Sequence, residues 1–238
     1  MRVSIIIPVL NEAPLIRRFL AHLRERAPGA EIIVVDGASI DGTDQLAAGL
    51  CDQLVRIDQA SRALQMNAGA SVASGDVFWF LHADSEVPGE CLDEIRRIMA
   101  DPAVSGGYFR IRLPSGVVYR LSDSFAHYAG FPLRMRCGDH GIFCRRSAFI
   151  DASGFPDVPI MEDVEFFRRL HRCGQVIHSN KRISASPRRY EAIGPTRLTF
   201  AYGLIATLYF FGVHPSALGP LYQQTCCAAK RRNPADPI

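Results

Sequence analysis

The fold is decided by two stretches of sequence, IIIPVLNE at Ile5–Glu12 and VVDGASIDGT at Val34–Thr43. Each stretch begins with the end of a short apolar run rich in β-branched residues and continues into a polar loop. The two apolar runs are Val3–Ile7 and Ile32–Val35. Such runs are typical of strands covered by helices on both faces. Between them a helix is predicted, ending at Pro28-Gly29, with apolar residues at helical spacing at Leu15, Ile16, Phe19, Leu20 and Leu23. The two stretches therefore predict a βαβ unit.

The alternation of strands and helices continues to about Met99, which predicts an α/β fold of the Rossmann-like type, with a mixed, mostly parallel sheet flanked by helices. The next expected elements are a helix from Thr43 to Leu50, a strand at Leu54–Ile57, a helix at Leu64–Ala73 and a strand at Val77–Leu81. Beyond Met99 we expect a hairpin at Gly106–Val118, a short strand at Gly138–Cys144 and an amphipathic helix at Val164–Leu170. No linker or repeat interrupts this pattern. We expect one domain at residues 1–229, with a nucleotide-binding half at about 1–100, an acceptor half at about 101–229 and a disordered tail at 230–238.

The composition is that of a globular protein: 238 residues, 48% of them hydrophobic and 21% charged. A net charge of +3 is too small to indicate nucleic acid as a partner. The seven cysteines form no CxxC pair, which argues against a zinc site or a disulfide framework and favours the reducing cytoplasm. Pro8 interrupts the first apolar run before a signal-peptide core is complete, so secretion is not expected.

The longest apolar stretch, Leu198–Val213, falls short of the roughly 20 residues that cross a bilayer. We interpret it as a buried helix. Contact with a membrane surface is the alternative.

Acidic residues follow three of the predicted strands or begin a helix. Asp36 comes directly after a buried strand, where a carboxylate can accept hydrogen bonds from ribose hydroxyls or a base edge, although a turn role is also open. Asp84 ends another strand and is the leading candidate to bind Mg²⁺ or Mn²⁺ beside a diphosphate. His82 is either a second ligand or a histidine bonded to backbone. Glu162 and Asp163 either cap a helix or supply a general base.

Five motifs together resemble the family 2 inverting glycosyltransferases of the GT-A fold. They are IPVLNE, VVDGASIDGT, RALQMNAGASVASGDVFWFLHADS, GDHGIFCRR and FPDVPIMEDVEFFRRL, and the match covers roughly Arg2–Tyr222. More narrowly, QMNAGA, HAD, GDHGIF, PIMEDVE, RRYE and YFFGVHP are similar to the branch of arsenosugar or selenium-associated glycosyltransferases, which includes the selenosugar synthases of selenoneine biosynthesis. That resemblance implies a UDP-sugar donor, such as UDP-N-acetylglucosamine or UDP-glucose, and selenophosphate as the acceptor.

The resemblance also implies roles for single residues. Asp163 is expected to be the base, with Glu162 orienting the acceptor, and Asp84 to hold the metal. The uridine pocket and its surroundings would comprise Pro8, Glu12, Asp36, Asp41, Arg62 and Asn67. His82 departs from the family pattern, because it stands where the metal-binding DxD motif has its first aspartate. An anionic acceptor would require cationic groups nearby, for which the candidates are His140, Arg145, Arg146, Arg188 and Arg189.

Two other functions remain open from the sequence. A transferase acting on a lipid-linked acceptor at a membrane would use the apolar stretch at Leu198–Phe211. A non-catalytic nucleotide-sugar-binding protein would explain His82 as a degraded metal ligand. The presence of Asp84, Glu162 and Asp163 together argues against the second, because a protein that only binds has no need of a base.

Overall fold

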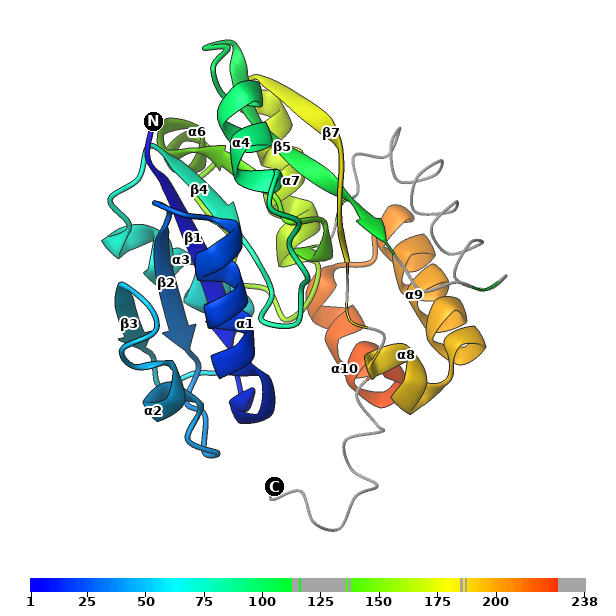
Figure 1. The fold of residues 1–238 in the computed structure, drawn as a ribbon. Helices are drawn as coiled ribbons and strands as arrows, with labels where there is room; N and C mark the ends of the chain where they lie inside the picture. The colour runs from blue at the N-terminus through cyan, green and yellow to red at the C-terminus, as the bar shows by residue number, and fades with distance from the viewer. Residues whose placement is uncertain (113–115, 117–135, 137, 185, 187, 227–238) are drawn as a thin grey trace. The chain divides into compact units, whose positions relative to one another are not determined.

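A computed structural model describes residues 1–112, 116, 136, 138–184, 186 and 188–226 (Figure 1). Within these residues lies a seven-stranded sheet of order β3-β2-β1-β4-β6-β5-β7. All strand pairs are parallel except the two that involve β6. The strands are β1 Val3–Val9, β2 Glu31–Asp36, β3 Gln53–Arg56, β4 Val77–Phe80, β5 Val104–Arg112, β6 Phe143–Arg145 and β7 Gln175–Ser184. The predicted mixed, mostly parallel sheet is confirmed.

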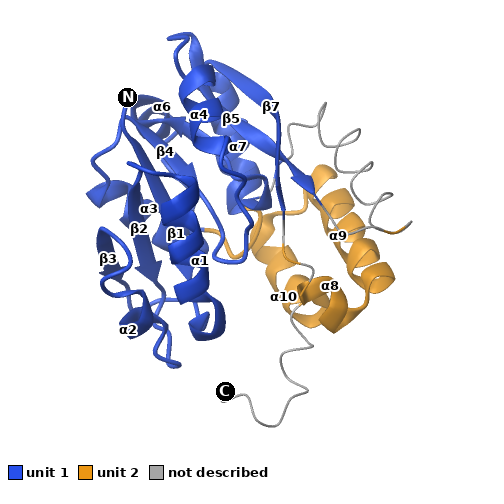
Figure 2. Cartoon of the chain, in the orientation of Figure 1, with its two compact units in different colours: residues 1–112, 134–157, 162–185 blue, residues 113–133, 158–161, 186–238 orange. Residues whose placement is uncertain are grey.

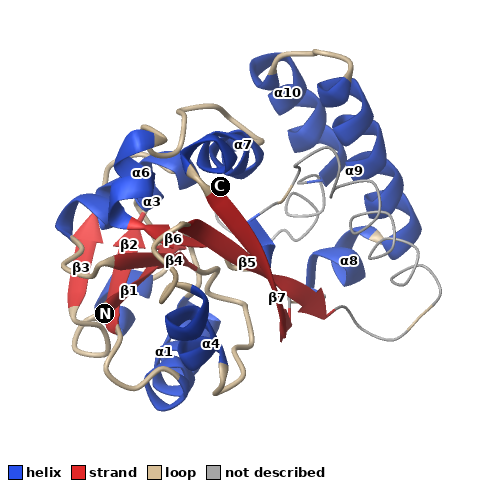
Figure 3. Cartoon of the chain, turned by 90° about the horizontal axis from the view of Figure 1, so that it is seen from above, coloured by secondary structure: helices blue, strands red, loops and turns tan. Residues whose placement is uncertain are grey.

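Helices cover both faces of this sheet (Figure 3). They are α1 Ala13–Arg26, α2 Thr43–Ala47, α3 Arg62–Val72, α4 Cys91–Ile98, α6 Arg146–Asp151 and α7 Glu162–Cys173, with a 3₁₀ turn, η1, at Gly138–His140. Alternate residues of β1 sort to opposite faces. Ile5 and Ile7 join the core beneath α1 and α4, whereas Ile6 joins the core beneath α3, α6 and α7. Burial on both faces explains why the strands read as continuous apolar runs.

The first half of the chain follows the predicted pattern closely. The predicted helix from Thr43 to Leu50 is shorter, since α2 ends at Ala47 and Gly49 adopts a left-handed backbone with φ of +79°. Pro8 does not end β1, which continues to Val9 in parallel register with Asp36 of β2. The strand therefore reaches further toward its carboxyl end than the sequence suggested.

Several predictions beyond Met99 were wrong. The described part of the expected hairpin, from Gly106 to Arg112, lies in one continuous strand, β5, while 113–115, 117 and 118 lie outside the described residues. The expected strand at Gly138–Cys144 begins instead as the turn η1, and only Phe143–Arg145 is extended. Helix α4, helix α6 and strand β7 were not anticipated. The predicted tail at 230–238 lies outside the described residues.

The chain divides into two compact units (Figure 2). Unit 1 comprises residues 1–112, 134–157 and 162–185, and holds the whole sheet. Unit 2 comprises residues 113–133, 158–161 and 186–238. Its helices are α8 Arg188–Ile193, α9 Pro195–Phe210 and α10 Pro215–Cys226. The apolar stretch that begins at Leu198 thus lies in unit 2, and it is buried on one side only, because Phe200 and Phe211 are exposed.

Candidate active site

The loops that follow β1 and β2 are joined to each other by hydrogen bonds. Asn11 N–H donates to Ser39 Oγ at 2.9 Å, and Ile40 N–H donates to Asn11 Oδ1 at 3.0 Å. Asp41 Oδ2 accepts from Ala13 N–H, in the first turn of α1, at 3.0 Å. Parallel strands open their carboxyl ends at one edge of a sheet, so these contacts build a single polar rim there.

Asp41 and Glu12 both contact the hydroxyl group of Thr43, Asp41 through its side chain and Glu12 through its backbone N–H. Asp41 Oδ1 accepts from the Thr43 hydroxyl at 2.5 Å, and Glu12 N–H donates to Thr43 Oγ1 at 2.8 Å. Burial alone would raise the pKa of Asp41, but the hydrogen bonds from Thr43 and Ala13 bring it below its ordinary value. Asp41 therefore fixes the loop as an ionised carboxylate, and the predicted contact with a nucleotide stays a prediction.

Asp36 lies at the carboxyl end of β2 and is only 3% exposed. Its Oδ2 accepts from Ser39 N–H at 3.0 Å, whereas its Oδ1 is buried and has no hydrogen-bond partner among the described residues. A buried carboxylate oxygen without a donor is costly. Asp36 thus has an open accepting position of the kind that a ligand hydroxyl or N–H would fill.

Gln65 was not anticipated as part of this edge. Its Nε2 donates to the carbonyl oxygens of Val9 and Val35, each at 2.8 Å, and so ties the end of β1 to the end of β2. A Cβ on Gly37 would lie 2.9 Å from the Gln65 amide, which explains why glycine follows Asp36. The sequence signal was a polar residue on the buried, apolar side of α3, beside Met66.

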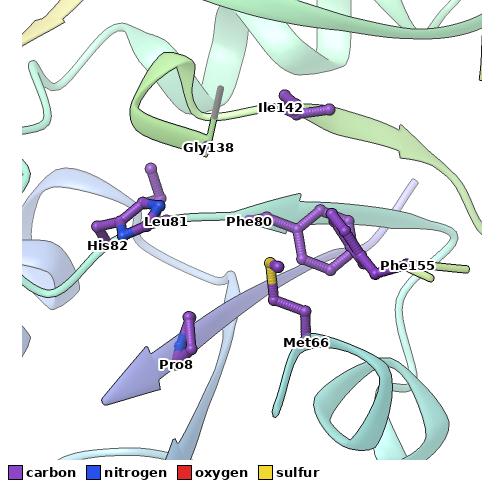
Figure 4. Close-up of a pocket in the computed structure, with 8 residues that line it drawn as sticks. All are labelled: Pro8, Met66, Phe80, Leu81, His82, Gly138, Ile142 and Phe155. Carbon is purple, nitrogen blue, oxygen red and sulfur yellow. The ribbon is translucent and has the colours of Figure 1, made fainter. Parts of the chain in front are cut away.

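The end of β4 meets the turn η1 at this same edge. A small pocket there is lined by Pro8, Met66, Phe80, Leu81, His82, Gly138, Ile142 and Phe155 (Figure 4). Its volume of about 10 Å³ accommodates a single water molecule at most. Pro8 and His82 are therefore neighbours across β1 and β4, and the pocket itself is too small for a nucleotide.

His82 is the first residue of a tight turn, since its carbonyl oxygen accepts from Ser85 N–H at 3.1 Å. Asp84 lies within that turn. His82 Nε2 is 3.8 Å from Asp139 Oδ1 in η1, and a Cβ on Gly138 would come within 2.5 Å of the same nitrogen. The HAD and GDHGIF motifs are thus in direct contact.

The metal prediction can be compared with these donors. In the described part of the chain, no group of three or more His, Cys, Asp or Glu side chains is arranged to hold a metal ion. A cage made of protein ligands alone does not fit. A Mg²⁺ or Mn²⁺ ion that takes most of its ligands from a diphosphate and water needs only one or two protein ligands, and the assignment of Asp84 and His82 as those ligands stays a prediction.

Asp163 is brought to the same place from the start of α7. Its Oδ2 accepts from Gly138 N–H at 2.5 Å, and the side chain is 6% exposed. Gly138 therefore donates its N–H to Asp163, and the side of it on which a Cβ would stand faces His82 Nε2. Three segments that are far apart in the sequence therefore meet around Gly138. They are the segment after β4, the start of η1 and the start of α7.

Glu162, the neighbour of Asp163, is buried and forms an ion pair with Arg62 of α3, with 2.8 Å between Oε1 and Nε. Apart from this contact with Arg62, neither oxygen of Glu162 has a hydrogen-bond partner in the described residues. Burial, reinforced by the negative charge of Asp163, raises the pKa of Glu162 to about 7, although Arg62 acts in the opposite direction. Glu162 therefore takes up a proton at a higher pH than an ordinary glutamate does.

Asn67 is engaged by backbone rather than open to a ligand. Its amide donates to Phe155 O at 2.8 Å and accepts from Phe155 N–H at 2.9 Å, which holds the loop before α7 against α3. Gly154 has a left-handed backbone, φ +60°, and a Cβ there would lie 2.7 Å from the Asn67 amide oxygen. The amide of Asn67 is thus a structural clip, and a position beside the nucleotide stays a prediction.

The structure does not bring Arg145 and Arg146 to this edge. Arg145 pairs with Val77, the first residue of β4, so both arginines lie at the opposite, amino edge of the parallel strands. Arg145 donates to the carbonyl oxygens of Val104, Met99 and Asp101, and Arg146 to those of Gly75 and Ala73. Their guanidinium groups therefore stabilise loops, which corrects the expectation that they bind an acceptor phosphate.

His140 is also displaced from the expected role. It is 8% exposed, its Nδ1 lies 3.1 Å from Phe109 O, and its ring packs edge-on against Tyr108. Burial lowers the pKa of His140 to about 4, and the positive charge of Arg136 acts in the same direction. A neutral, buried imidazole does not supply the positive charge expected for phosphate binding.

Arg188 and Arg189 belong to unit 2. Arg189 donates to the hydroxyls of Tyr202 at 3.1 Å and Tyr222 at 2.8 Å, which joins α8 to α9 and α10, and Arg188 donates to Ser186 Oγ. Their predicted contact with an acceptor stays a prediction.

Comparisons with known proteins agree with the fold of this chain. The mannosyltransferase PcManGT from Pyrobaculum calidifontis, solved with GDP-Man and Mn²⁺, is 22% identical, with a TM-score of 0.65 over 100% of this chain and 76% of that one. TarS residues 1–349 from S. aureus, solved with UDP-GlcNAc, is 16% identical, with a TM-score of 0.63 over 97% of this chain and 83% of that one. No curated protein sequence was found to match. These structures share the fold of this chain, which is the expected GT-A fold.

The family model for glycosyl transferase family 2 matches residues 4–152. That range includes the loops after β1 and β2, helix α3, the HAD turn and η1, and it spans more than half of the 238 residues. The chain therefore belongs to glycosyltransferase family 2.

Proposed function

We propose that this glycosyltransferase transfers a sugar, with inversion, from a UDP-sugar to a small nucleophilic acceptor. The observation that carries the proposal is the meeting of His82 and Asp163 around Gly138, at the edge where Asp36 keeps a buried oxygen without a donor. In this proposal residues of about 1–100 bind the nucleotide and residues of about 101–229 bind the acceptor.

The donor end of the site is formed by the joined loops after β1 and β2. Asp36 Oδ1 accepts from the ribose or the uracil, because it is the buried acceptor there without a partner. Pro8, Glu12 and Asp41 surround the uridine, and Asp41 also fixes its loop through Ala13 and Thr43. UDP-N-acetylglucosamine or UDP-glucose is the proposed donor; the UDP-GlcNAc complex of TarS, which has the same fold, supports the uridine nucleotide.

The diphosphate end lies near the HAD turn. Asp84 and His82 would hold Mg²⁺ or Mn²⁺, which neutralises the charge that develops on the departing diphosphate. The Mn²⁺ in the PcManGT structure supports a divalent ion in this fold. Arg62, which is partly exposed and paired with Glu162, supplies a positive charge from the start of α3.

The reaction proposed is a single displacement at the anomeric carbon. Asp163 takes the proton of the acceptor, while Glu162 orients the acceptor, and the bond to UDP breaks as the new bond forms. An α-linked donor gives a β-linked product. The resemblance to selenosugar synthases makes selenophosphate the sharpest acceptor hypothesis, and its anionic selenium would need positioning more than deprotonation.

The test is an assay of UDP release with each donor, with Mg²⁺ or Mn²⁺, against a panel of acceptors that includes selenophosphate. We expect release that depends on one acceptor and a product of inverted anomeric configuration by NMR. Release that is independent of every acceptor, or a retained configuration, would refute the proposal.

A further inference from the structure

Helix α9 is apolar on two sides, and only one of them is buried. Its single charged residue is Arg197. The buried side is formed by Leu198, Ala201, Ile205 and Tyr209. A helix that is apolar all round is normally buried in a core or in contact with lipid. The second apolar side of α9 therefore requires its own explanation.

That second side is a continuous exposed line, here called the α9 stripe. It comprises Arg197, Phe200, Leu204, Thr207 and Phe211, with Phe210 beside its end. The spacing of three and four residues places these side chains on one face, over about four turns. Phe200 is 74% and Phe211 77% exposed, and large aromatic side chains exposed in a row mark an interaction surface rather than ordinary scatter.

Unit 2, which carries the stripe, is the basic part of the chain. Its residues include seven Lys or Arg and three Asp or Glu, a net charge of +4. The whole chain has a net charge of +3, so unit 1 has a net charge of −1. The basic residues of unit 2 are Arg120, Arg188, Arg189, Arg197, Lys230, Arg231 and Arg232. Of these, Arg120, Lys230, Arg231 and Arg232 lie outside the described residues, and Arg197 lies on the stripe itself. The positive net charge of the sequence is thus carried by the unit that bears the stripe.

We propose that the α9 stripe docks on an anionic lipid bilayer, with α9 lying in the plane of the interface. Exposed phenylalanines insert among the acyl chains, while neighbouring cationic groups are attracted to acidic headgroups. At 16 residues, α9 is about 24 Å long from a rise of 1.5 Å per residue, shorter than the hydrocarbon layer. No helix in the described residues is long and apolar enough to cross a membrane. The helix lies on the bilayer rather than across it.

A second copy of this chain is the less favourable occupant. A symmetric contact through the stripe would bring two units of net charge +4 together, with Arg197 on each. An anionic bilayer instead compensates that charge. The inference does not depend on the donor or acceptor of the proposed function, because lipid binding is measured without turnover.

The test is co-sedimentation of the full chain with vesicles of phosphatidylcholine, with and without phosphatidylglycerol. We expect sedimentation with the phosphatidylglycerol vesicles, weakened by added salt. The double variant Phe200→Ser and Phe211→Ser should reduce binding about tenfold or more, since it removes the two exposed aromatic side chains that insert into the bilayer. Arg197→Glu, a second independent variant, should reduce binding to the anionic vesicles as well.

The matched control is Ile150→Ser on α6 of unit 1, whose side chain is 66% exposed outside the stripe. It should bind vesicles like the parent protein, and far-ultraviolet circular dichroism should show that all variants are folded. Absence of binding to phosphatidylglycerol vesicles, or equal binding by the double variant and Ile150→Ser, would overturn the inference. The inference would also be overturned if the parent protein did not bind vesicles but formed a dimer in light scattering, and if the double variant abolished that dimer. The surface would then bind a second copy of the chain.

Discussion

The Nε atom of Arg62 lies 2.8 Å from Oε1 of Glu162, which joins the start of α3 to the start of α7 beneath the candidate active site. The partners differ in environment: Glu162 is 2% exposed and Arg62 is 36% exposed. A buried carboxylate between a cation and a second carboxylate, Asp163, makes this pair sensitive to pH and to the approach of a charged ligand.

Glu162→Gln should stabilise the protein at alkaline pH. The pKa of Glu162 is about 7 in the folded protein against 4.5 as the ordinary value, so the folded state binds more protons between these values. Stability therefore falls as pH rises through that window, and the loss is complete above pH 7. Glutamine cannot ionise, so the variant should exceed the parent by about 1 to 3 kcal/mol at pH 8, with a smaller difference at pH 5. Urea unfolding at both pH values measures this, with Glu165→Gln on the same helical turn as control. A difference that does not change with pH would contradict the assignment.

Asp163→Asn should lower turnover by about 10² to 10⁴ while nucleotide affinity changes little, because general-base catalysis contributes that much. Asparagine keeps an oxygen that can accept from Gly138 N–H, so the loop should stay in place. An acceptor that is already anionic should show a smaller loss than one that must give up a proton. Steady-state kinetics and calorimetric titration with UDP measure the two effects. Equal loss of turnover and affinity would make Asp163 a binding residue instead.

The first strands could be predicted because burial on both faces requires apolar residues throughout β1, β2 and β4. Strand β5 was misread because glycine is a poor strand former, yet Gly106 and Gly107 are needed there. A Cβ at either position would come within 2.5 Å of Phe143 in β6. Strand β7 was missed because it lies at the sheet edge with many polar, partly exposed residues, and the sequence pattern does not reveal its partner.

Whether the position of a site residue could be predicted from the sequence depended on the direction of its strand in the sheet. Asp36 is the last residue of β2 and His82 comes two residues after β4, and the rule for parallel strands alone puts them at one edge of the sheet. Arg145 is the last residue of β6, and because β6 runs antiparallel to β4, its carboxyl end lies at the opposite edge of the sheet. The convergence of Asp163 on Gly138 joins residues 25 positions apart through a backbone N–H, for which no side-chain pattern exists.

Asp84→Ala should weaken the metal-dependent part of donor binding. Asp84 lies in the turn closed by the hydrogen bond between His82 O and Ser85 N–H. Its carboxylate is a better ligand for Mg²⁺ or Mn²⁺ than the imidazole of His82, because these ions prefer oxygen. We expect the affinity of the variant for the UDP-sugar in the presence of metal to be about tenfold or more below that of the parent. In the presence of chelator, the variant and the parent should have the same affinity. Titration with and without EDTA measures both values. An equal loss in the two conditions would remove Asp84 from the metal site.

Gly138→Ala should impair metal-dependent turnover without unfolding the protein. The added Cβ would lie 2.5 Å from His82 Nε2, so the imidazole of His82 must move away from Gly138. The matched control is Gly203→Ala in α9, where nothing lies within 4 Å of the added Cβ. That control should be neutral or more stable by about 0.5 to 1 kcal/mol, because alanine favours a helix. Full activity of Gly138→Ala would show that the position of His82 does not matter.

Arg145→Ala and Arg146→Ala should each lower stability and leave the acceptor KM unchanged. Both guanidinium groups donate to backbone carbonyl oxygens at the amino edge of the sheet, and Arg146 also lies 5.1 Å from the centre of the Phe78 ring. Removing a guanidinium group that donates to two or more backbone carbonyl oxygens costs about 1 to 3 kcal/mol, so the melting temperature should fall. Thermal unfolding and acceptor titration separate the two roles. A raised KM at unchanged stability would return these arginines to the acceptor site and would mean that the acceptor reaches the opposite edge of the sheet.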